Sequence, residues 1–270
     1  MCVTGAGMMR RPRGDLTEAT FRRLLSELAA RQTPVRFIRW GEPLLHERLV
    51  WMIASLSSAG CITHVGTNGS LLTDDMVRRL IAAGLKSIKI SFQGTDTESY
   101  EETRRGLYFE FLLSRLESLH RTRGQLQYPY IAVTTTITDE APERVDRFKD
   151  LVSRYADSCM VGATNFDLAR DAEMQARQTE RNRAAFCPEV FDKLSVDWDG
   201  TATLCCRDWD RELAIGSVNE ESLGELWRSP RAAAVRSAVA SGAERAGYAL
   251  CRTCYDYLGL TRATDGRSVR

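Results

Sequence analysis

Two spacings of apolar residues alternate along the first 163 positions of the chain. In some segments apolar residues recur at every third or fourth position, which predicts amphipathic helices, and in others they form short runs, which predict strands. The predicted strands are 35–40, 62–65, 87–92, 130–138 and 160–163. The predicted helices are 15–33, 49–59, 74–83, 98–123 with a break near Gly106, and 142–155. Strands that alternate with helices favour βαβ units and a parallel sheet.

The repeated strand–helix steps predict an α/β fold of the partial (β/α) barrel type, because no G-x-G-x-x-G marks a dinucleotide-binding fold. In such barrels the chemistry lies at the carboxyl ends of the strands. Polar or glycine-containing clusters follow four of the predicted strands, at Gly41-Glu42, Thr67-Asn68, Ser91 to Gln93, and Thr164-Asn165. One such cluster is typical of a turn or a helix cap. Their recurrence at the same end of successive strands favours a ligand site.

The last third of the chain is arranged around an expected β-hairpin. Asp199-Gly200 separates two alternating runs, which is a strong short-range hairpin signal. Cys187 and Cys205 lie near the open ends of this hairpin, and Cys251-Arg252-Thr253-Cys254 supplies a further close pair. Four converging thiolates suit tetrahedral zinc or an iron–sulfur cluster. The C-x-x-C pair by itself also fits a redox-active dithiol.

The four thiolates can converge only if the chain between Cys205 and Cys251 folds back. Leu223, Leu226 and Trp227 predict a helix that does this, with Asn219 as its N-cap and its end at Ser229-Pro230. Cys206 neighbours Cys205, and adjacent residues of a strand point to opposite faces. We therefore expect Cys206 to point away from the other sulfurs.

Composition excludes several classes of partner. Hydrophobic residues make up 43% of the 270 residues, which is enough for a substantial core, and the formal net charge of +1 implies no electrostatic attraction to nucleic acid or an anionic membrane. No apolar run approaches the roughly 18 residues of a membrane span, and the start of the chain has no signal-peptide pattern. The expected location is cytoplasmic, where eight cysteines favour metal ligation over disulfides.

Three segments resemble motifs of the radical S-adenosylmethionine (SAM) superfamily. Trp40-Gly41-Glu42-Pro43 is similar to its Gly-Gly-Glu-Pro motif, with Trp in place of the first Gly, and Ser91-Phe92-Gln93-Gly94 is similar to its Ser-Leu-Asp-Gly strand end, with Gln in place of Asp. The segment that ends in Arg105-Gly106 resembles the part that follows in many members. The SAM-binding residues that the resemblance implies are Gly41, Glu42, Pro43, Thr67, Asn68, Ser91, Gln93 and Arg105.

The C-terminal cysteines resemble the SPASM/twitch extension of the same superfamily. This resemblance implies that Cys187, Cys205, Cys251 and Cys254 hold one auxiliary 4Fe–4S cluster. The expected organisation is a radical SAM partial barrel at 1–180, an auxiliary-cluster domain at 181–258 with a small hairpin and helix, and a polar tail at 259–270. Together the resemblances cover nearly the whole chain.

The chain departs from the superfamily at its start. The signature C-x-x-x-C-x-x-C supplies three thiolates to a radical-generating 4Fe–4S cluster, and Cys2 stands where the third should be. One thiolate cannot hold such a cluster. We expect a (β/α)6 barrel whose first strand and first two cysteines lie upstream of Met1. The alternative is a degenerate relative that has lost them. In either case the printed chain is expected to be inactive by itself.

The resemblance implies an enzyme that makes a 5′-deoxyadenosyl radical from SAM and abstracts hydrogen from its substrate. A small sugar or aminocyclitol-like molecule is the favoured substrate, and a peptide is the alternative. A flavodoxin or ferredoxin is the expected reductant, with no nucleic-acid or membrane partner. The rival from another class is a non-catalytic protein whose four cysteines hold a structural zinc ion.

Overall fold

The computed structural model describes residues 4, 7–103, 109–137, 140–163, 187–240 and 248–252. It divides the chain into two compact units. One is Leu25–Thr164, and the other combines Met1–Leu24 with Asn165–Arg270. The domain boundary expected at residue 180 lies outside the described residues. In the part of the chain that the structure describes, no helix is long and apolar enough to cross a membrane.

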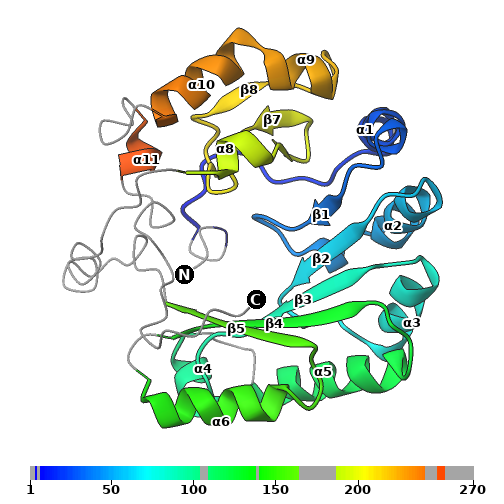
Figure 1. Ribbon diagram of the computed structural model, residues 1–270, viewed down its shortest axis with the longest axis vertical. Coiled ribbons are helices and arrows are strands. Elements are labelled where there is room, and N and C mark those ends of the chain that lie inside the picture. The colour runs from blue at the N-terminus through cyan, green and yellow to red at the C-terminus, as the bar shows by residue number, and fades with distance from the viewer. Residues whose placement is uncertain are drawn as a thin grey trace. The chain divides into compact units, whose positions relative to one another are not determined.

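The Leu25–Thr164 unit contains a parallel five-stranded sheet in the order β1-β2-β3-β4-β5 (Figure 1). The strands are β1 Val35–Phe37, β2 Thr63–Thr67, β3 Ser87–Ser91, β4 Tyr130–Ile137 and β5 Ser158–Ala163. Each strand pairs with the next strand in the sequence, and helices lie in the connections. The predicted α/β architecture with a parallel sheet is therefore confirmed.

Helices alternate with these strands, largely where the spacing of apolar residues predicts them. They are α1 Glu18–Ala30, η1 Pro43–Leu45, α2 Leu49–Ser58, α3 Asp74–Ala82, α4 Thr97–Thr103, α5 Phe109–Arg123 and α6 Pro142–Val152. The predicted break in the fourth helix falls at 104–108, outside the described residues. Thr73 caps α3, as predicted, because its side chain accepts from Met76 N. The predicted start of the first helix at Asp15 is wrong, since α1 begins at Glu18 and Thr17 Oγ1 accepts from Thr20 N.

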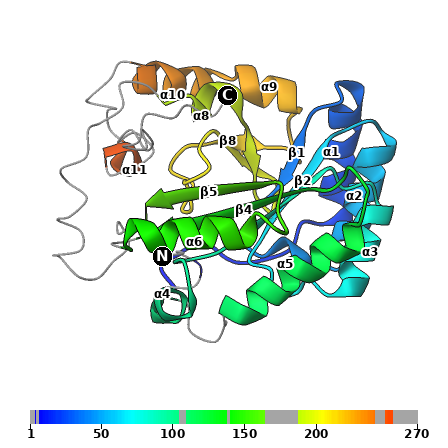
Figure 2. The ribbon, with the colours of Figure 1, turned by 60° about the horizontal axis from the view of Figure 1, so that its bottom comes forward.

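One face of the parallel sheet is apolar and forms the main core. Helices α2, α3, α5 and α6 lie along this side of the sheet (Figures 1 and 2). The fully buried strand residues of this face are Val65, Ile88, Ile90, Ile131 and Val133. They cluster with the helix residues Ile53, Leu80, Leu116 and Phe148. Each such side chain stabilises the fold by about 1.5–3 kcal/mol relative to an exposed one.

The opposite face of the same sheet is unusually polar for parallel strands, which commonly have apolar residues on both faces. The residues that alternate with the core positions include Arg36, His64, Lys89, Ser91 and Thr134. Most are half-buried, and Arg36 is exposed. A sheet that is apolar toward its helices and polar on the other face is suited to present polar groups to a ligand.

The second unit contains a small antiparallel sheet of β6 Ser195–Val196, β7 Thr201–Thr203 and β8 Ala214–Ser217. The hairpin predicted around Asp199-Gly200 joins β6 to β7, and Gly200 adopts a φ of +90° in its turn. Strand β8 was not predicted. The helices that accompany this sheet in the described residues are α8 Glu189–Asp192, α9 Leu223–Arg228, α10 Pro230–Ala240 and α11 Ala249–Arg252.

The predicted helix around Leu226 is confirmed as α9, but its predicted cap at Asn219 is wrong. Ser222 is the N-cap: its side chain accepts from Glu225 N, and the Glu225 carboxylate accepts from Ser222 N in return. This is a reciprocal capping box, which satisfies two backbone donors at once. Asn219 instead donates its side-chain amide to Asp199 O, so it supports the β6–β7 turn. The predicted end of the helix at Ser229-Pro230 is confirmed.

Candidate functional site

Glu42 joins the carboxyl ends of β1 and β2. Its Oε1 atom accepts hydrogen bonds from Leu44 N at 3.2 Å and Thr67 Oγ1 at 2.7 Å, and its Oε2 atom accepts one from Asn68 N at 2.8 Å. The first of these bonds caps the η1 helix. All three donors are electrically neutral, and Glu42 makes no ion pair with any residue that the structure describes. A carboxylate offers about four acceptor positions, so one position on Oε2 remains available to a further donor.

The loop after β2 holds Thr67 and Asn68 in place for Glu42. Thr67 Oγ1 also accepts from Gly69 N at 3.0 Å, and Asn68 Oδ1 accepts from Ser70 N at 2.8 Å. Gly69 has a φ of +79°, and a Cβ there would lie 2.3 Å from Leu112 Cδ1. A glycine is therefore required at this turn. The backbone before Glu42 is also strained, since Arg39 has a φ of +140°, a conformation that is concentrated at functional sites.

The end of β3 continues along β4 beyond the last residue of the strand. Phe92 N donates to Thr134 O and Gly94 N donates to Thr136 O. The Thr135 hydroxyl donates back to Gly94 O. These bonds fix the backbone of 91–94, the segment that contains the predicted SAM-binding residues Ser91 and Gln93. Ser91 itself is half-buried and belongs to the polar face of the sheet.

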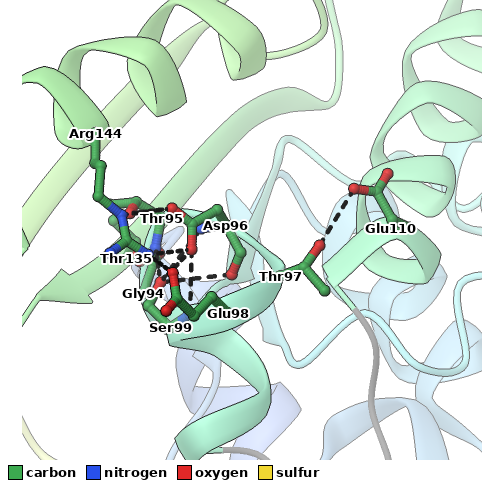
Figure 3. A network of polar contacts seen from close by, with 9 residues as sticks. All are labelled: Gly94, Thr95, Asp96, Thr97, Glu98, Ser99, Glu110, Thr135 and Arg144. Carbon is green, nitrogen blue, oxygen red and sulfur yellow. Dashed lines mark hydrogen bonds and ion pairs between the residues drawn. The ribbon is translucent and has the colours of Figure 1, made fainter.

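A second carboxylate, Asp96, organises the loop that leads from β3 into α4 (Figure 3). Arg144 of α6 contacts both of its oxygens, with Nε–Oδ2 at 2.7 Å and Nη2–Oδ1 at 2.6 Å. Ser99 N donates to Asp96 Oδ1 at 3.1 Å, as at a helix N-terminus, and Ser99 Oγ accepts from Thr95 N. The Arg144 guanidinium holds the pKa of Asp96 well below its usual range, with help from the Ser99 hydrogen bonds. Asp96 is thus a fully compensated structural anion.

The structure brings some of the predicted SAM-binding residues together. Glu42, Thr67 and Asn68 form one hydrogen-bonded group, with Gly41 and Pro43 beside Glu42 in the chain. Ser91 and Gln93 lie at the end of the next strand of the sheet. Arg105 and Thr164-Asn165 lie outside the described residues. That these residues bind SAM stays a prediction, whereas the geometry of the Glu42 group is observed.

Sequence reasoning missed Asp96 and Arg144. Asp96-Thr97-Glu98-Ser99 precedes a helix, and an Asp three residues before a Ser is a recognisable N-cap pattern. That signal could have located Asp96. Nothing in the sequence pairs it with Arg144, which lies 48 positions further on.

The loop that contains Cys205 is held by Asp208, which is buried with only 1% of its surface exposed. Its carboxylate accepts from Thr203 Oγ1 at 2.9 Å, Leu213 N at 2.8 Å and Glu212 N at 2.7 Å. Cys205 and Cys206 follow β7 and do not belong to it. The strand alternation that was expected to turn Cys206 away from Cys205 therefore does not apply.

The cysteines expected to bind the auxiliary cluster are only partly described. Cys187 and Cys251 are buried and Cys205 is half-buried, and cysteine thiolates are the usual ligands of iron–sulfur clusters. Within the described residues, no group of three or more His, Cys, Asp or Glu side chains could hold a metal ion. The predicted convergence of Cys187, Cys205 and Cys251 is therefore not observed. Cys2 and Cys254 lie outside the described residues, and ligation by this set stays a prediction.

Comparison with known proteins identifies both parts of the chain. The family model "Radical SAM superfamily" matches residues 1–152, and the model "Iron-sulfur cluster-binding domain" of the SPASM type matches residues 187–255. The AdoMet-dependent heme synthase of Methanosarcina barkeri is 28% identical over 149 residues, which are 54% of this chain and 41% of the synthase. The chain thus spans less than half the length of that relative.

Two solved structures share the fold at low sequence identity. The structure of BtrN in complex with AdoMet and 2-DOIA has a TM-score of 0.60 and 15% identity, and the match covers 96% of this chain and 91% of BtrN. Streptococcus suis SuiB bound to precursor peptide SuiA has a TM-score of 0.63 and 14% identity, with 85% of this chain and 62% of SuiB covered. At these identities the likeness establishes the fold.

Proposed function

The chain belongs to the radical SAM superfamily and carries a SPASM iron–sulfur domain, and on this premise we propose that it acts on a small polyol, sugar or aminocyclitol-like molecule. When bound, SAM and a reduced 4Fe–4S cluster would supply a 5′-deoxyadenosyl radical able to take a hydrogen atom from an unreactive carbon. The protein's own part is to bind, orient and shield the reactants from water.

The observation that carries the SAM-binding part of the proposal is the charge balance at Glu42. Among the described residues, its carboxylate is held between two strand ends by three neutral donors and no cation, with room for one more donor. A primary ammonium, such as that of the methionyl group of SAM, would complete this site with a charge-assisted hydrogen bond. Thr67 and Asn68 would orient the carboxylate, and Gly41 leaves the approach open, since a Cβ there would meet nothing within 4 Å.

The polar face of the sheet supports a small hydrophilic substrate. Hydroxyl-bearing and charged residues of β1 to β4 share this face, and such residues can hydrogen-bond a polyol. The likeness to BtrN, which extends over nearly all of both chains, is consistent with this proposal. A peptide is the second candidate, favoured by the likeness to SuiB, although more than a third of SuiB lies outside that match.

The auxiliary cluster is proposed to be held by Cys187, Cys205, Cys251 and Cys254, with Asp208 fixing the loop of Cys205. A flavodoxin or ferredoxin is the proposed electron donor. Anaerobic reconstitution tests the cluster: brown protein with iron and sulfide, and loss of iron in the Cys205→Ala variant, is the expected result. Colourless protein that binds only zinc would identify the site as structural zinc instead.

The reaction is tested by measuring 5′-deoxyadenosine under strong reductant. The printed chain has only Cys2 for the radical-generating cluster, and we expect it to release none above a no-enzyme control. A form that carries the complete C-x-x-x-C-x-x-C motif should release it, and more of it when small polyols or amino sugars are added. If only peptides increase the yield, the small-molecule assignment is wrong. If neither form cleaves SAM, the proposed activity is wrong.

A further inference from the structure

The chain has four lysines, and Lys89 differs from the other three in having no partner for its charge among the described residues. Lys149 pairs with Asp146 at 3.5 Å, Lys193 pairs with Glu189, and Lys86 lies 4.3 Å from the centre of the Tyr128 ring. Lys89 is half-buried in the middle of β3, on the polar face of the sheet, and makes no ion pair with any described residue. A partly desolvated ammonium without a counter-ion is costly to the fold.

Arg36 adds a second cation to the same face. It lies on β1 opposite His64 of β2, and the next position of β2 on this face, Gly66, lies opposite Lys89. Arg36 also makes no ion pair with a described carboxylate. The two cations thus lie on the same face on either side of β2, and neither makes an ion pair with a carboxylate that the structure describes. The two like charges repel each other, and an anion bound between them would offset that repulsion.

The residues opposite Lys89 on the two adjacent strands are small. It lies between Gly66 on β2 and Ala132 on β4, the two smallest residue types. The side chain of Ile38, which follows β1, packs over Gly66, because a Cβ at Gly66 would lie 2.8 Å from Ile38 Cδ1. The result is a long cationic side chain in a row of small ones, with an apolar group at one side.

His64 supplies a neutral polar group next to the two cations. Its Nδ1 atom lies 2.7 Å from Ser87 Oγ, and its Nε2 atom is buried without a partner among the described residues. Burial and the charges of Arg36 and Lys89 lower the pKa of His64 to about 4, so the imidazole is uncharged at neutral pH. His64 therefore adds no third positive charge and leaves Lys89 and Arg36 as the cations of the group.

We propose that Lys89 and Arg36 bind an anionic group, a carboxylate or a phosphate, of the molecule on which the enzyme acts. The inference rests on the proposed function, since it adds a charge to the proposed polyol or sugar substrate. It explains why a half-buried lysine lies among small residues without a counter-ion in the described part of the chain. Burial and the nearby Arg36 also lower the pKa of Lys89, as expected for an ammonium that has no anion beside it to stabilise its charge.

Competitive labelling of the lysines tests this site in the full chain, without SAM or reductant. Trace acetic anhydride is applied with inorganic phosphate, with citrate, or with chloride at equal ionic strength, and acetylation of each lysine is measured by mass spectrometry. We expect saturable protection of Lys89 by phosphate, citrate or both. Lys86, Lys149 and Lys193 serve as internal controls and should show none. Phosphate protecting alone indicates a phosphorylated substrate, and citrate alone indicates a carboxylate.

Variants provide a second measurement by calorimetric titration of the protecting anion. Lys89→Gln should weaken anion binding about tenfold, the effect of losing one charge-assisted hydrogen bond. Lys86→Gln removes a lysine of similar burial from the same strand region and should bind as the parent does. Lys89→Arg keeps the charge and should retain binding, which guards against a folding defect in Lys89→Gln.

Equal labelling of Lys89 with phosphate, citrate and chloride would overturn the proposal, as would equal protection of all four lysines. The outcome is separate from that of the proposed function, because anion binding is measured without SAM cleavage. If anions protect Lys89 but the form with the complete cysteine motif makes no 5′-deoxyadenosine, the proposed reaction is wrong and the anion site is still supported. If that form makes 5′-deoxyadenosine but no anion protects Lys89, the radical chemistry is supported and the anionic substrate class is wrong.

Discussion

Glu42 and Asp96 occupy equivalent places at the ends of β1 and β3, and they differ in how their charge is balanced. Each carboxylate follows a strand of the parallel sheet and accepts a backbone N–H at the start of the next helix. Asp96 also receives a guanidinium through two hydrogen bonds. From the described residues, Glu42 receives only a hydroxyl and two backbone N–H groups.

This difference separates a structural carboxylate from one that is available to a ligand. Asp96 has its cation within the protein, so a further cation would gain little there. Glu42 has no cationic partner among the described residues, and it has an available acceptor position at the end of the sheet where such folds bind their ligands. Position at a strand end alone therefore does not identify a binding residue, and the partners of the carboxylate must be counted as well.

The largest expected effect is on SAM affinity. In a form with the complete cysteine motif, Glu42→Ala should weaken SAM binding by about ten- to a hundredfold, since a hydrogen bond to a charged group contributes about 1.5–3 kcal/mol. Asp96→Ala is the matched control and should bind SAM like the parent. Dissociation constants by equilibrium dialysis check both. Similar affinities for the parent and Glu42→Ala would make Glu42 a structural cap like Asp96.

Much of this arrangement could be predicted from sequence. The alternation of apolar spacing located all five strands of the sheet, and the polar residues at the strand ends indicated Glu42, Thr67 and Asn68. Local patterns succeeded because the strand ends of a parallel sheet are brought to one edge by topology alone. The spacing could not show that Thr67 Oγ1 and Asn68 N both point at the same carboxylate.

The next largest expected difference is between the stability losses caused by substituting Gly94 and Gly41, the glycines that precede Asp96 and Glu42. Gly94 has a φ of +77°, and a Cβ there would lie 2.4 Å from Ser99 Oγ and 2.8 Å from the Ser99 carbonyl carbon. Gly94→Ala should therefore cost about 2–3 kcal/mol of unfolding free energy. A Cβ at Gly41 would have no atom within 4 Å, so Gly41→Ala should change the unfolding free energy by under about 1 kcal/mol. Urea denaturation measures both variants. Equal losses would mean that the loop before Glu42 is as constrained as that before Asp96.

Removing the compensated carboxylate should have a smaller effect on stability. Asp96→Ala loses a helix cap, worth about 1 kcal/mol, and a pair with Arg144 that is partly exposed and worth less than about 1 kcal/mol. A total loss of about 1–2 kcal/mol is expected by thermal or urea unfolding. A loss above that range would show that Asp96 supports more of the loop than its direct contacts indicate.

The parts that sequence could not predict depend on contacts between distant segments. Arg144 reaches Asp96 from α6, and no local pattern in either segment indicates the other. Asn219 looked like a cap because it precedes an apolar run, but Ser222 has Glu225 three residues on, and the reciprocal capping box outweighs the single side chain. Strand β8, Ala214–Ser217, was missed because Ile215 is its only large apolar residue and no turn signal such as Asp199-Gly200 marks it.

The smallest expected effect is the pH dependence of the stability that Asp96 contributes. The Arg144 pair holds the pKa of Asp96 below its ordinary value of 3.8, so the unfolded chain takes up this proton at a higher pH than the folded protein does. The stability from Asp96 is therefore fully present above about pH 4 and is lost as the pH falls further. Because 38% of the Asp96 side chain is exposed, we expect this pH-dependent contribution to the unfolding free energy to be less than about 1 kcal/mol.

The difference in unfolding free energy between the parent and Asp96→Asn should narrow between about pH 4 and pH 2. In an Arg144→Gln background this narrowing should largely disappear, because the cation that lowers the pKa of Asp96 has been removed. Narrowing that persists without Arg144 would assign the lowered pKa of Asp96 to the Ser99 hydrogen bonds. Asp96 would then resemble Glu42, whose partners among the described residues are all neutral.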